Sequence, residues 1–318
     1  MHPSRSGADS SLNMPKPAAI PQKPGNLALV TACYGRRGRM EAATGEELPY
    51  LAASRRHKPV CGDEVRFELR ADDSPALLRD ILPRRNELSR TGARERTEVV
   101  AANFSLLAIV AAPEPAPDYE LVDRLLCAAA GSGAEGLIVW NKTDLGRGRP
   151  ARLLEYEAAG FDVATVSALT GARVRRLRRR LKAHTSVLAG QSGGGKSTLV
   201  NALLGREAAA AGELSEKARR GRHTTASAAM YSLPGGGRVM DLPGVRSLMP
   251  VLTDYGELQA GFPEFAGPAQ ECRFANCRHR NEPGCSVLEA VAAGRLPAGR
   301  HAGYLALLRE FEELAASV

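Results

Sequence analysis

Between residue 27 and about residue 90, short apolar runs alternate with polar residues and turns. The runs lie in LALVTACYG, RGRMEAA, LPYLAA, KPVCGDEVRFEL and LLRDILPR. Five short strands with Gly-Arg turns suit a small barrel of the OB type, a common RNA-binding scaffold. Periodicity alone does not separate this barrel from an SH3-like one, so both remain open here.

Further along the chain, compact apolar runs alternate with segments of helical periodicity. The runs LIVW, FDVATV, VLA and RVM are typical of buried strands, and residues 197–204 follow the third run as a helix. Residues 173–184, RVRRLRRRLKAH, predict another helix, with Val174, Leu177 and Leu181 on its apolar stripe. This alternation predicts an α/β domain with a parallel sheet.

The C-terminal segment predicts helices. SVLEAVAAG and GRHAGYLALLREFEELAASV have helical periodicity, and the second places Leu305, Leu308, Phe311 and Leu314 on one stripe. The first 26 residues are rich in Ser, Pro and Gly and poor in apolar residues, so we expect them to be disordered. The expected division is a disordered extension (1–26), a barrel (27–95), an α/β domain (96–256) and a helical domain (257–318).

Composition supports several domains and excludes some classes of protein. The chain has 318 residues, which is long for one core, and 44% of them are hydrophobic and 25% charged. It has no run of eighteen apolar residues, and its N-terminus lacks the charged-then-apolar pattern of a signal peptide. We therefore expect a soluble cytoplasmic protein with no membrane partner.

The net charge of +8 suggests a polyanionic partner, although solubility alone also explains such a surplus. Arginines cover most of the predicted helix at 173–184, and EKARRGRH (216–223) adds a second basic cluster. A solvated helix face and a nucleic-acid contact are about equally good explanations of that helix.

A phosphate-binding loop stands between the predicted strand VLA and the helix that follows it. Residues 190–197 match G-x-x-x-x-G-K-[ST], with glycines that let backbone N–H groups converge on phosphate oxygens. Lys196 reaches the β- and γ-phosphates as a catalytic residue, and Ser197 can ligate Mg²⁺. The alternative is a flexible Gly/Ser turn. The residues expected at the nucleotide are Gly190, Gln191, Ser192, Gly193, Gly194, Gly195, Lys196, Ser197 and Thr198.

Guanine-reading residues precede this loop in the sequence. N-K-x-D begins at Asn141, directly after LIVW, and the Asp144 carboxylate can accept from N1–H and the exocyclic amine of guanine. Asn141 would bond to N7, and the stem of Lys142 would cover the ring. Ser167 and Ala168, after FDVATV, leave space for a backbone N–H to approach O6.

Residues that sense the γ-phosphate come after the loop. Asp241, at the start of D-L-P-G, can hold Mg²⁺ through water, and the Gly244 N–H can reach the γ-phosphate. Thr224 or Thr225, in GRHTTASA, can ligate Mg²⁺, unless the pair merely fills a strand or turn. Because the base-reading segments come first, the chain predicts a circularly permuted GTPase domain. A parallel sheet tolerates this order because its original ends can be adjacent.

Three cysteines and a histidine follow within fourteen residues. Cys272, Cys277, His279 and Cys285 form C-xxxx-C-x-H-xxxxx-C, which predicts a closed structural zinc site. A disulfide is the less economical alternative in a cytoplasmic chain. Cys33, Cys61 and Cys127 lie in apolar segments and are expected to be core thiols.

Together these motifs resemble the RsgA (YjeQ) family of circularly permuted GTPases, which act in late maturation of the small ribosomal subunit. The resemblance rests on PVCGDEV, ILPRRNELSR, NKTDL, GQSGGGKSTLVN, GRHTT, DLPGVR and the Cys/His knuckle, and so covers nearly the whole chain. It implies an N-terminal OB-fold, a central permuted GTPase and a C-terminal zinc domain. It also implies GTP/GDP, Mg²⁺ and Zn²⁺ as cofactors, and the small subunit and its rRNA as partners that stimulate hydrolysis.

Three positions depart from the family pattern. Leu242 stands where Thr is usual, Gly194 where Val is common, and Ala226 where a third Thr is usual. We expect the first two to be tolerated beside backbone-mediated contacts. The third leaves the Mg²⁺ ligand between Thr224 and Thr225, and we favour Thr225.

Val245 cannot orient the attacking water as a Gln would after D-L-P-G. His223 can do so, and the resemblance agrees, but His223 can also serve as an RNA contact. The leading hypothesis is thus a monomeric enzyme that hydrolyses GTP on the small subunit as a release checkpoint. A binding module with incidental turnover is the second, and an ATP-dependent kinase is disfavoured by Asp144, Ser167 and Ala168.

Overall fold

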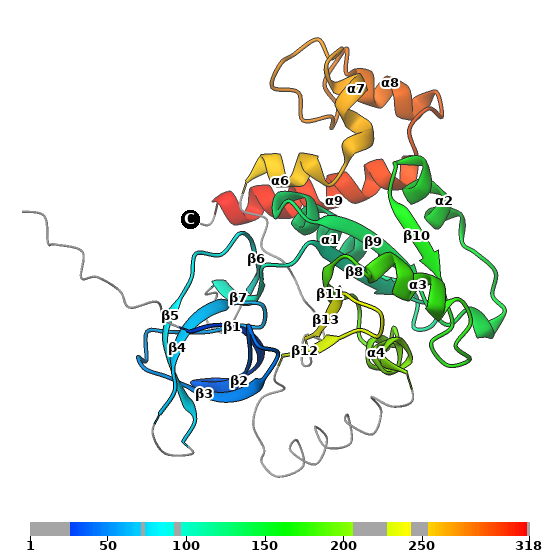
Figure 1. Ribbon diagram of the computed structural model, residues 1–318. Coiled ribbons are helices and arrows are strands. Elements are labelled where there is room, and N and C mark those ends of the chain that lie inside the picture. Colours follow the sequence, from blue (N-terminus) through cyan, green and yellow to red (C-terminus); the bar gives the residue numbers. More distant parts are fainter. Residues whose placement is uncertain (1–25, 71–73, 92–96, 206–227, 243–253, 317–318) are drawn as a thin grey trace, which may run out of the picture.

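The N-terminal part of the chain is a closed five-stranded barrel. A computed structural model describes residues 26–70, 74–91, 97–205, 228–242 and 254–316 (Figure 1). The barrel closes in the order β1-β2-β3-β5-β4-β1, with β3 parallel to β5 and the other pairs antiparallel. This is the OB-type arrangement, and the SH3-like alternative is set aside. The strands are β1 (Asn26–Tyr34), β2 (Arg37–Ala42), β3 (Glu47–Ala52), β4 (Glu64–Glu68) and β5 (Ala76–Ile81).

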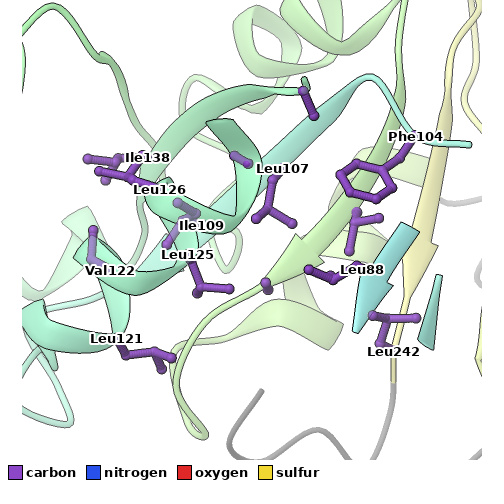
Figure 2. Packing of buried hydrophobic residues seen from close by; sticks show 14 of the residues in the cluster. Leu88, Phe104, Leu107, Ile109, Leu121, Val122, Leu125, Leu126, Ile138 and Leu242 are labelled. Atoms are coloured by element: carbon purple, nitrogen blue, oxygen red, sulfur yellow. The ribbon is translucent and has the colours of Figure 1, made fainter. Parts of the chain in front are cut away.

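A two-stranded hairpin follows the barrel and packs on the core of the next domain. Its strands are β6 (Glu87–Thr91) and β7 (Thr97–Ala102). Leu88 of β6 belongs to the same buried cluster as Phe104, Leu107 and Leu242, as Figure 2 shows. The boundary expected between residues 95 and 96 falls inside this hairpin, and the one expected at residue 257 falls inside helix α6 (Tyr255–Ala260).

The central domain is a six-stranded sheet with helices on both faces. Its order is β10-β9-β8-β11-β13-β12, and all neighbours are parallel except β12 and β13. Helices α1 and α2 cover one face, and α3 and α4 cover the other. The elements are β8 (Leu106–Ala111), α1 (Tyr119–Gly131), β9 (Glu135–Trp140), η2 (Thr143–Leu145), α2 (Ala151–Ala158), β10 (Asp162–Thr165), α3 (Val174–Leu181), β11 (Thr185–Ala189), α4 (Lys196–Leu204), β12 (Ala229–Ser232) and β13 (Arg238–Asp241).

The barrel and the central sheet are joined by backbone pairing and by a shared core. Strand β1 pairs with β12 at Ala32 and Ala229, so one sheet runs through both domains. Gly62, with φ of 91°, lies so close to Ala102 that a Cβ would stand 1.9 Å from its carbonyl oxygen. Cys61 beside it is completely buried in the same cluster as Leu107 and Met240. The two domains therefore meet without a linker.

The C-terminal part is helical and packs on α1 (Figure 1). The last helix buries Tyr304, Leu307 and Leu308, whereas Leu314 is 51% exposed. The apolar stripe predicted for this helix was therefore wrong at its C-terminal end. No helix in the described ranges is long and apolar enough to cross a membrane. The elements are α6 (Tyr255–Ala260), η3 (Pro263–Phe265), α7 (Ala266–Ala269), α8 (Ser286–Ala292) and α9 (Ala298–Ala316).

A buried ion network fastens this C-terminal part to the central domain. Arg300 of α9 is fully buried and donates to Asp123 of α1, to the Glu264 carboxylate at 2.7 Å and to the Gly261 carbonyl at 2.6 Å. Arg152 of α2 donates to the other Asp123 oxygen at 2.9 Å. Burial raises the pKa of Asp123, while Arg300 and Arg152 oppose that rise. Buried charges persist only where they are paired and hydrogen-bonded in this way.

Replacing Arg300 by Met should destabilise the protein by about 3–5 kcal/mol, because Asp123 and Glu264 would lose a buried cationic partner. Urea unfolding of Arg300→Met measures the loss. Arg309→Met is the matched control, since Arg309 is exposed on the same helix and, among the described residues, donates a hydrogen bond to the Leu305 carbonyl alone. Equal stability of the two variants would contradict this account of the domain junction.

Candidate nucleotide-binding site and metal centre

The phosphate loop lies where the sequence predicted it, between β11 and α4. Lys196, the first residue of α4, donates from Nζ to the carbonyls of Gly190 at 2.6 Å and Gln191 at 2.7 Å. Burial lowers the pKa of Lys196, and the Asp241 carboxylate opposes that shift. Its ammonium is thus held inside the loop, where anionic oxygens can replace the two carbonyl acceptors.

Two glycines of the loop have no substitute. Gly190 has φ of 127°, and a Cβ there would lie 2.2 Å from the Val110 carbonyl oxygen. Gly195 has φ of 89°, and a Cβ there would lie 2.5 Å from Asn141 Nδ2. Both positions combine a left-handed backbone with close contact to a neighbouring strand end, so only glycine fits.

Asn141 joins the segments that were predicted to read the base and the phosphates. Its side chain is buried; Nδ2 donates to the Gly194 carbonyl at 3.0 Å, and Oδ1 accepts from the Ala168 N–H at 3.0 Å. The Asn141 N–H also donates to the Ala111 carbonyl at 2.8 Å. One amide therefore fixes the phosphate loop and the loop after β10 at the end of β9.

Asp144, Ser167 and Lys142 lie beside this junction. Ser167 Oγ donates to Asp144 Oδ1, which orients the carboxylate toward the loop after β10. Lys142 has φ of 59° and donates from Nζ to the Glu114 carbonyl at 2.8 Å. A left-handed conformation is uncommon for lysine and is held here by the surrounding contacts.

Of the residues predicted to lie near the γ-phosphate, the structure describes Asp241 and its neighbour Leu242. Asp241 ends β13 in register with Leu188 of β11, two residues before Gly190. Leu242 is buried and packs in the main core, which agrees with an apolar residue being tolerated there. His223, Thr224, Thr225 and Gly244 lie outside the described residues, and their roles stay predictions.

One contact that shapes the phosphate loop has no signal in the sequence. The Gln191 side chain accepts from the Asp118 N–H at 2.6 Å and donates to the Ala116 carbonyl at 2.8 Å. Asp118 in turn caps α1 by accepting from the Leu121 N–H at 2.9 Å. Gln191 thus ties the phosphate loop to the loop after β8. Nothing in the local pattern identifies a contact between residues more than seventy positions apart.

Cys272, Cys277, His279 and Cys285 converge on one point. Their ligand atoms all lie within 4.8 Å of one another. The two sulfurs of Cys272 and Cys285 are 3.9 Å apart, and they lie 3.6 Å and 3.5 Å from His279 Nδ1. Tetrahedral bonds of about 2.3 Å to sulfur place two sulfurs about 3.8 Å apart. All six cysteines of the chain are free thiols, which argues against the disulfide alternative.

The loop that carries these ligands is held by one carboxylate. Burial raises the pKa of Glu282, but the N–H groups of Arg278, Arg280 and Asn281 donate to it and lower its pKa to about 2. Burial also lowers the pKa of His279, favouring the neutral imidazole that binds metals. The ligand set therefore fits a closed zinc site.

Known proteins resemble this chain over most of its length. The profile of the family described as RsgA GTPase matches residues 81–249. The small ribosomal subunit biogenesis GTPase RsgA of Bordetella pertussis is 41% identical over 287 residues, covering 89% of this chain and 95% of that protein. The protein of the same name from Azotobacter vinelandii is 38% identical over 299 residues, covering 91% and 87%.

Solved structures show the same architecture. The crystal structure of YjeQ from Thermotoga maritima is 26% identical, with a TM-score of 0.68 over 90% of this chain and 98% of that one. YloQ, described as a circularly permuted GTPase, is 22% identical, with a TM-score of 0.66 over 93% and 98%, and supports the fold. This chain therefore belongs to the RsgA GTPase family and is a GTP hydrolase.

Proposed function

We propose that this GTPase hydrolyses GTP to GDP and phosphate on the small ribosomal subunit, as a late checkpoint in the maturation of that subunit. The relatives from Bordetella pertussis and Azotobacter vinelandii are named small ribosomal subunit biogenesis GTPases, and each is matched over more than 85% of its length. The match includes the barrel and the C-terminal domain. The partner is thus the small subunit with its rRNA, bound by a cytoplasmic monomer.

The observation that carries the nucleotide assignment is the position of Asn141. It bonds to the phosphate loop and to the Ala168 N–H together, so the segments proposed to contact the base and the phosphates lie in one site. In this proposal Asp144, Ser167 and Ala168 read guanine and Lys196 contacts the β- and γ-phosphates. Ser197 and Thr225 ligate Mg²⁺, which would neutralise charge on the phosphates.

The connection between barrel and sheet supports regulation by a docked partner. Strand β12, which follows the segment with Thr224 and Thr225, pairs with β1 of the barrel, and the Cys33 N–H donates to the Ala228 carbonyl at 3.3 Å. A force on the barrel is therefore transmitted directly to the strand that leads out of the Mg²⁺-binding segment. Docking of RNA on the barrel would favour one conformation of the segment with Thr224 and Thr225. In this proposal, His223 of the same segment orients the attacking water.

The predicted division of the chain fits this function. The barrel (27–95) binds RNA, the permuted domain (96–256) hydrolyses GTP, and the zinc-bound domain (257–318) supplies a second docking body. The hairpin β6–β7 goes with the hydrolase core, because Leu88 packs there. The structural zinc supplies much of the folding free energy of the C-terminal domain.

Asp144→Asn should weaken GTP binding by about tenfold to a hundredfold and improve binding of xanthosine triphosphate. The new amide donates where guanine also donates, and one charge-assisted hydrogen bond is worth about 1.5–3 kcal/mol. Titration with both nucleotides measures the change. Asp162→Asn, on the exposed end of β10, is the control. Unchanged GTP affinity would refute the base-reading assignment.

Metal analysis of protein purified without chelator should find one zinc ion per chain. Cys277→Ser should lose the ion and, with it, the cooperative unfolding of the C-terminal domain, because a structural metal links ligation to folding. Cys33→Ser serves as the control, since Cys33 lies in the barrel away from the knuckle. A zinc-free but stably folded wild-type protein would exclude the metal centre.

GTP turnover should be slow for the free protein and strongly accelerated by small ribosomal subunits. Free large subunits should have little effect. His223→Ala should retain nucleotide binding but lose the acceleration, because positioning of water acts on the transition state. Steady-state phosphate release with each subunit tests both points. No acceleration by small subunits, or equal acceleration by both, would leave only a generic GTPase.

A further inference from the structure

The loop between β8 and α1 holds the phosphate loop through one side chain. This proline loop covers residues 112–118, A-P-E-P-A-P-D, in which three prolines restrict the backbone. Gln191 Oε1 accepts from the Asp118 N–H at 2.6 Å. Gln191 Nε2 donates to the carbonyls of Ala116 at 2.8 Å and Pro115 at 3.3 Å. The donor and the acceptor of one carboxamide are therefore both bound by the same loop.

The proline loop is itself attached to the core of the domain. Asp118 caps α1 by accepting from the Leu121 N–H at 2.9 Å. Helix α1 is held in the main core by Leu121 and Leu125, as Figure 2 shows. Earlier in the loop, the Glu114 carbonyl accepts from Lys142 Nζ at 2.8 Å. The Gln191 side chain is thus anchored to a loop that a packed helix and the N-K-x-D segment hold in place.

The backbone of Gln191 in turn holds Lys196. Lys196 Nζ donates to the carbonyls of Gly190 at 2.6 Å and Gln191 at 2.7 Å. Gly190 directly follows β11 and lies against Val110, so the end of the strand fixes the first acceptor. Gln191 lies one residue farther from the strand, and its carbonyl accepts from the Gly194 N–H only at 3.4 Å. The second acceptor therefore depends on the Gln191 side chain for its position.

We propose that Gln191 is a positioning residue, whose carboxamide fixes the carbonyl that holds the Lys196 ammonium and so places that charge for the phosphates of GTP. A lysine ammonium is a point charge on a flexible stem, so its acceptors decide where the charge lies. Electrostatic stabilisation of a transition state is strong when the charges are placed before the reaction. The inference rests on the proposed contact of Lys196 with the β- and γ-phosphates and does not involve the ribosome.

The first test removes the carboxamide and keeps the length of the side chain. Gln191→Met should lower the single-turnover rate of GTP hydrolysis, measured with free protein in excess, by about tenfold to a hundredfold, because a displacement of about 1 Å has effects of that size. The affinities for GTP and GDP should change far less, since the flexible Lys196 stem still reaches phosphate oxygens in the ground state. Gln259→Met, at an exposed glutamine of α6, should behave like the wild type.

The second test restores the lost donor by protonation. The carboxylate of Gln191→Glu can accept from the Asp118 N–H, but it places a negative oxygen against the Ala116 carbonyl. A protonated carboxyl donates to that carbonyl as the amide does. The facing carbonyl oxygens should raise the pKa of the new carboxyl above about 4.3. The rate relative to wild type should therefore be low near neutral pH and rise as the pH falls, whereas the ratio for Gln191→Met should stay low throughout.

The other ionisable groups around this contact are common to the wild type and all Gln191 variants, so their titrations cancel in the ratio of rates. They are Glu114, Asp118, Lys142, Arg147, Lys196 and Asp241. Gln259→Glu adds a carboxyl of the same kind on α6 and should give a ratio that does not depend on pH. The pH dependence of Gln191→Glu thus reports on residue 191.

The outcomes separate this inference from the proposed function. A wild-type rate in Gln191→Met, or a rate ratio for Gln191→Glu that does not change with pH, would overturn the inference. An equal loss of rate and nucleotide affinity in Gln191→Met would also overturn it, because it would indicate a distorted loop. If Lys196→Met is impaired and Gln191→Met is not, only the inference fails. If both hydrolyse GTP like the wild type, the proposed phosphate contact of Lys196 fails as well.

Discussion

The site depends on one constraint, which is that parallel strands end at a common edge of their sheet. Strands β8, β9, β10, β11 and β13 are parallel; the loops after the first four contribute to the site, and β13 ends there with Asp241. The order in which the chain visits those strands does not affect which loops meet. A chain in which N-K-x-D precedes the phosphate loop can therefore bring these two segments together at Asn141, just as a chain with the opposite order could.

Two attachments of different physical kind hold the flanking domains to this sheet. The barrel is joined mainly by backbone pairing and apolar packing, which vary little with pH or salt, and by one partly exposed ion pair between Glu41 and Arg238. The C-terminal domain is joined through Arg300, whose buried charge requires Asp123 and Glu264 in fixed positions. Consequently a change of pH or salt should affect the attachment of the C-terminal domain more than that of the barrel, although both domains flank the same nucleotide site.

Local features were predicted well from the sequence because they depend on short spacings. The phosphate loop, the buried stripe Val174, Leu177 and Leu181 and the convergence of four candidate metal ligands all follow from residues fewer than fifteen positions apart. The barrel type was not decided, because it depends on β3 pairing with β5 rather than on any strand pattern. Leu314 was misassigned because periodicity does not show where a helix leaves its neighbour.

Contacts between distant residues had no signal in the pattern. The bonds of Gln191 to the loop after β8, and of Arg300 to Asp123, join residues that are far apart and individually ordinary. The basic helix was ambiguous for the same reason: Arg178 and Arg180 have structural partners, whereas the part of the chain that the structure describes holds none for Arg175, Arg176 and Arg179. Sequence spacing identified the helix but did not show which of its arginines have structural partners.

The close contact at Gly62 limits how this architecture can be rearranged. A chain that began at β8 would uncover Met240 and the other core residues that Cys61 and Leu88 now cover. Exposed apolar patches of that kind promote aggregation. The barrel is therefore not a portable module that can be exchanged or deleted by recombination, and the two domains are constrained to be inherited, and to change, as a single unit.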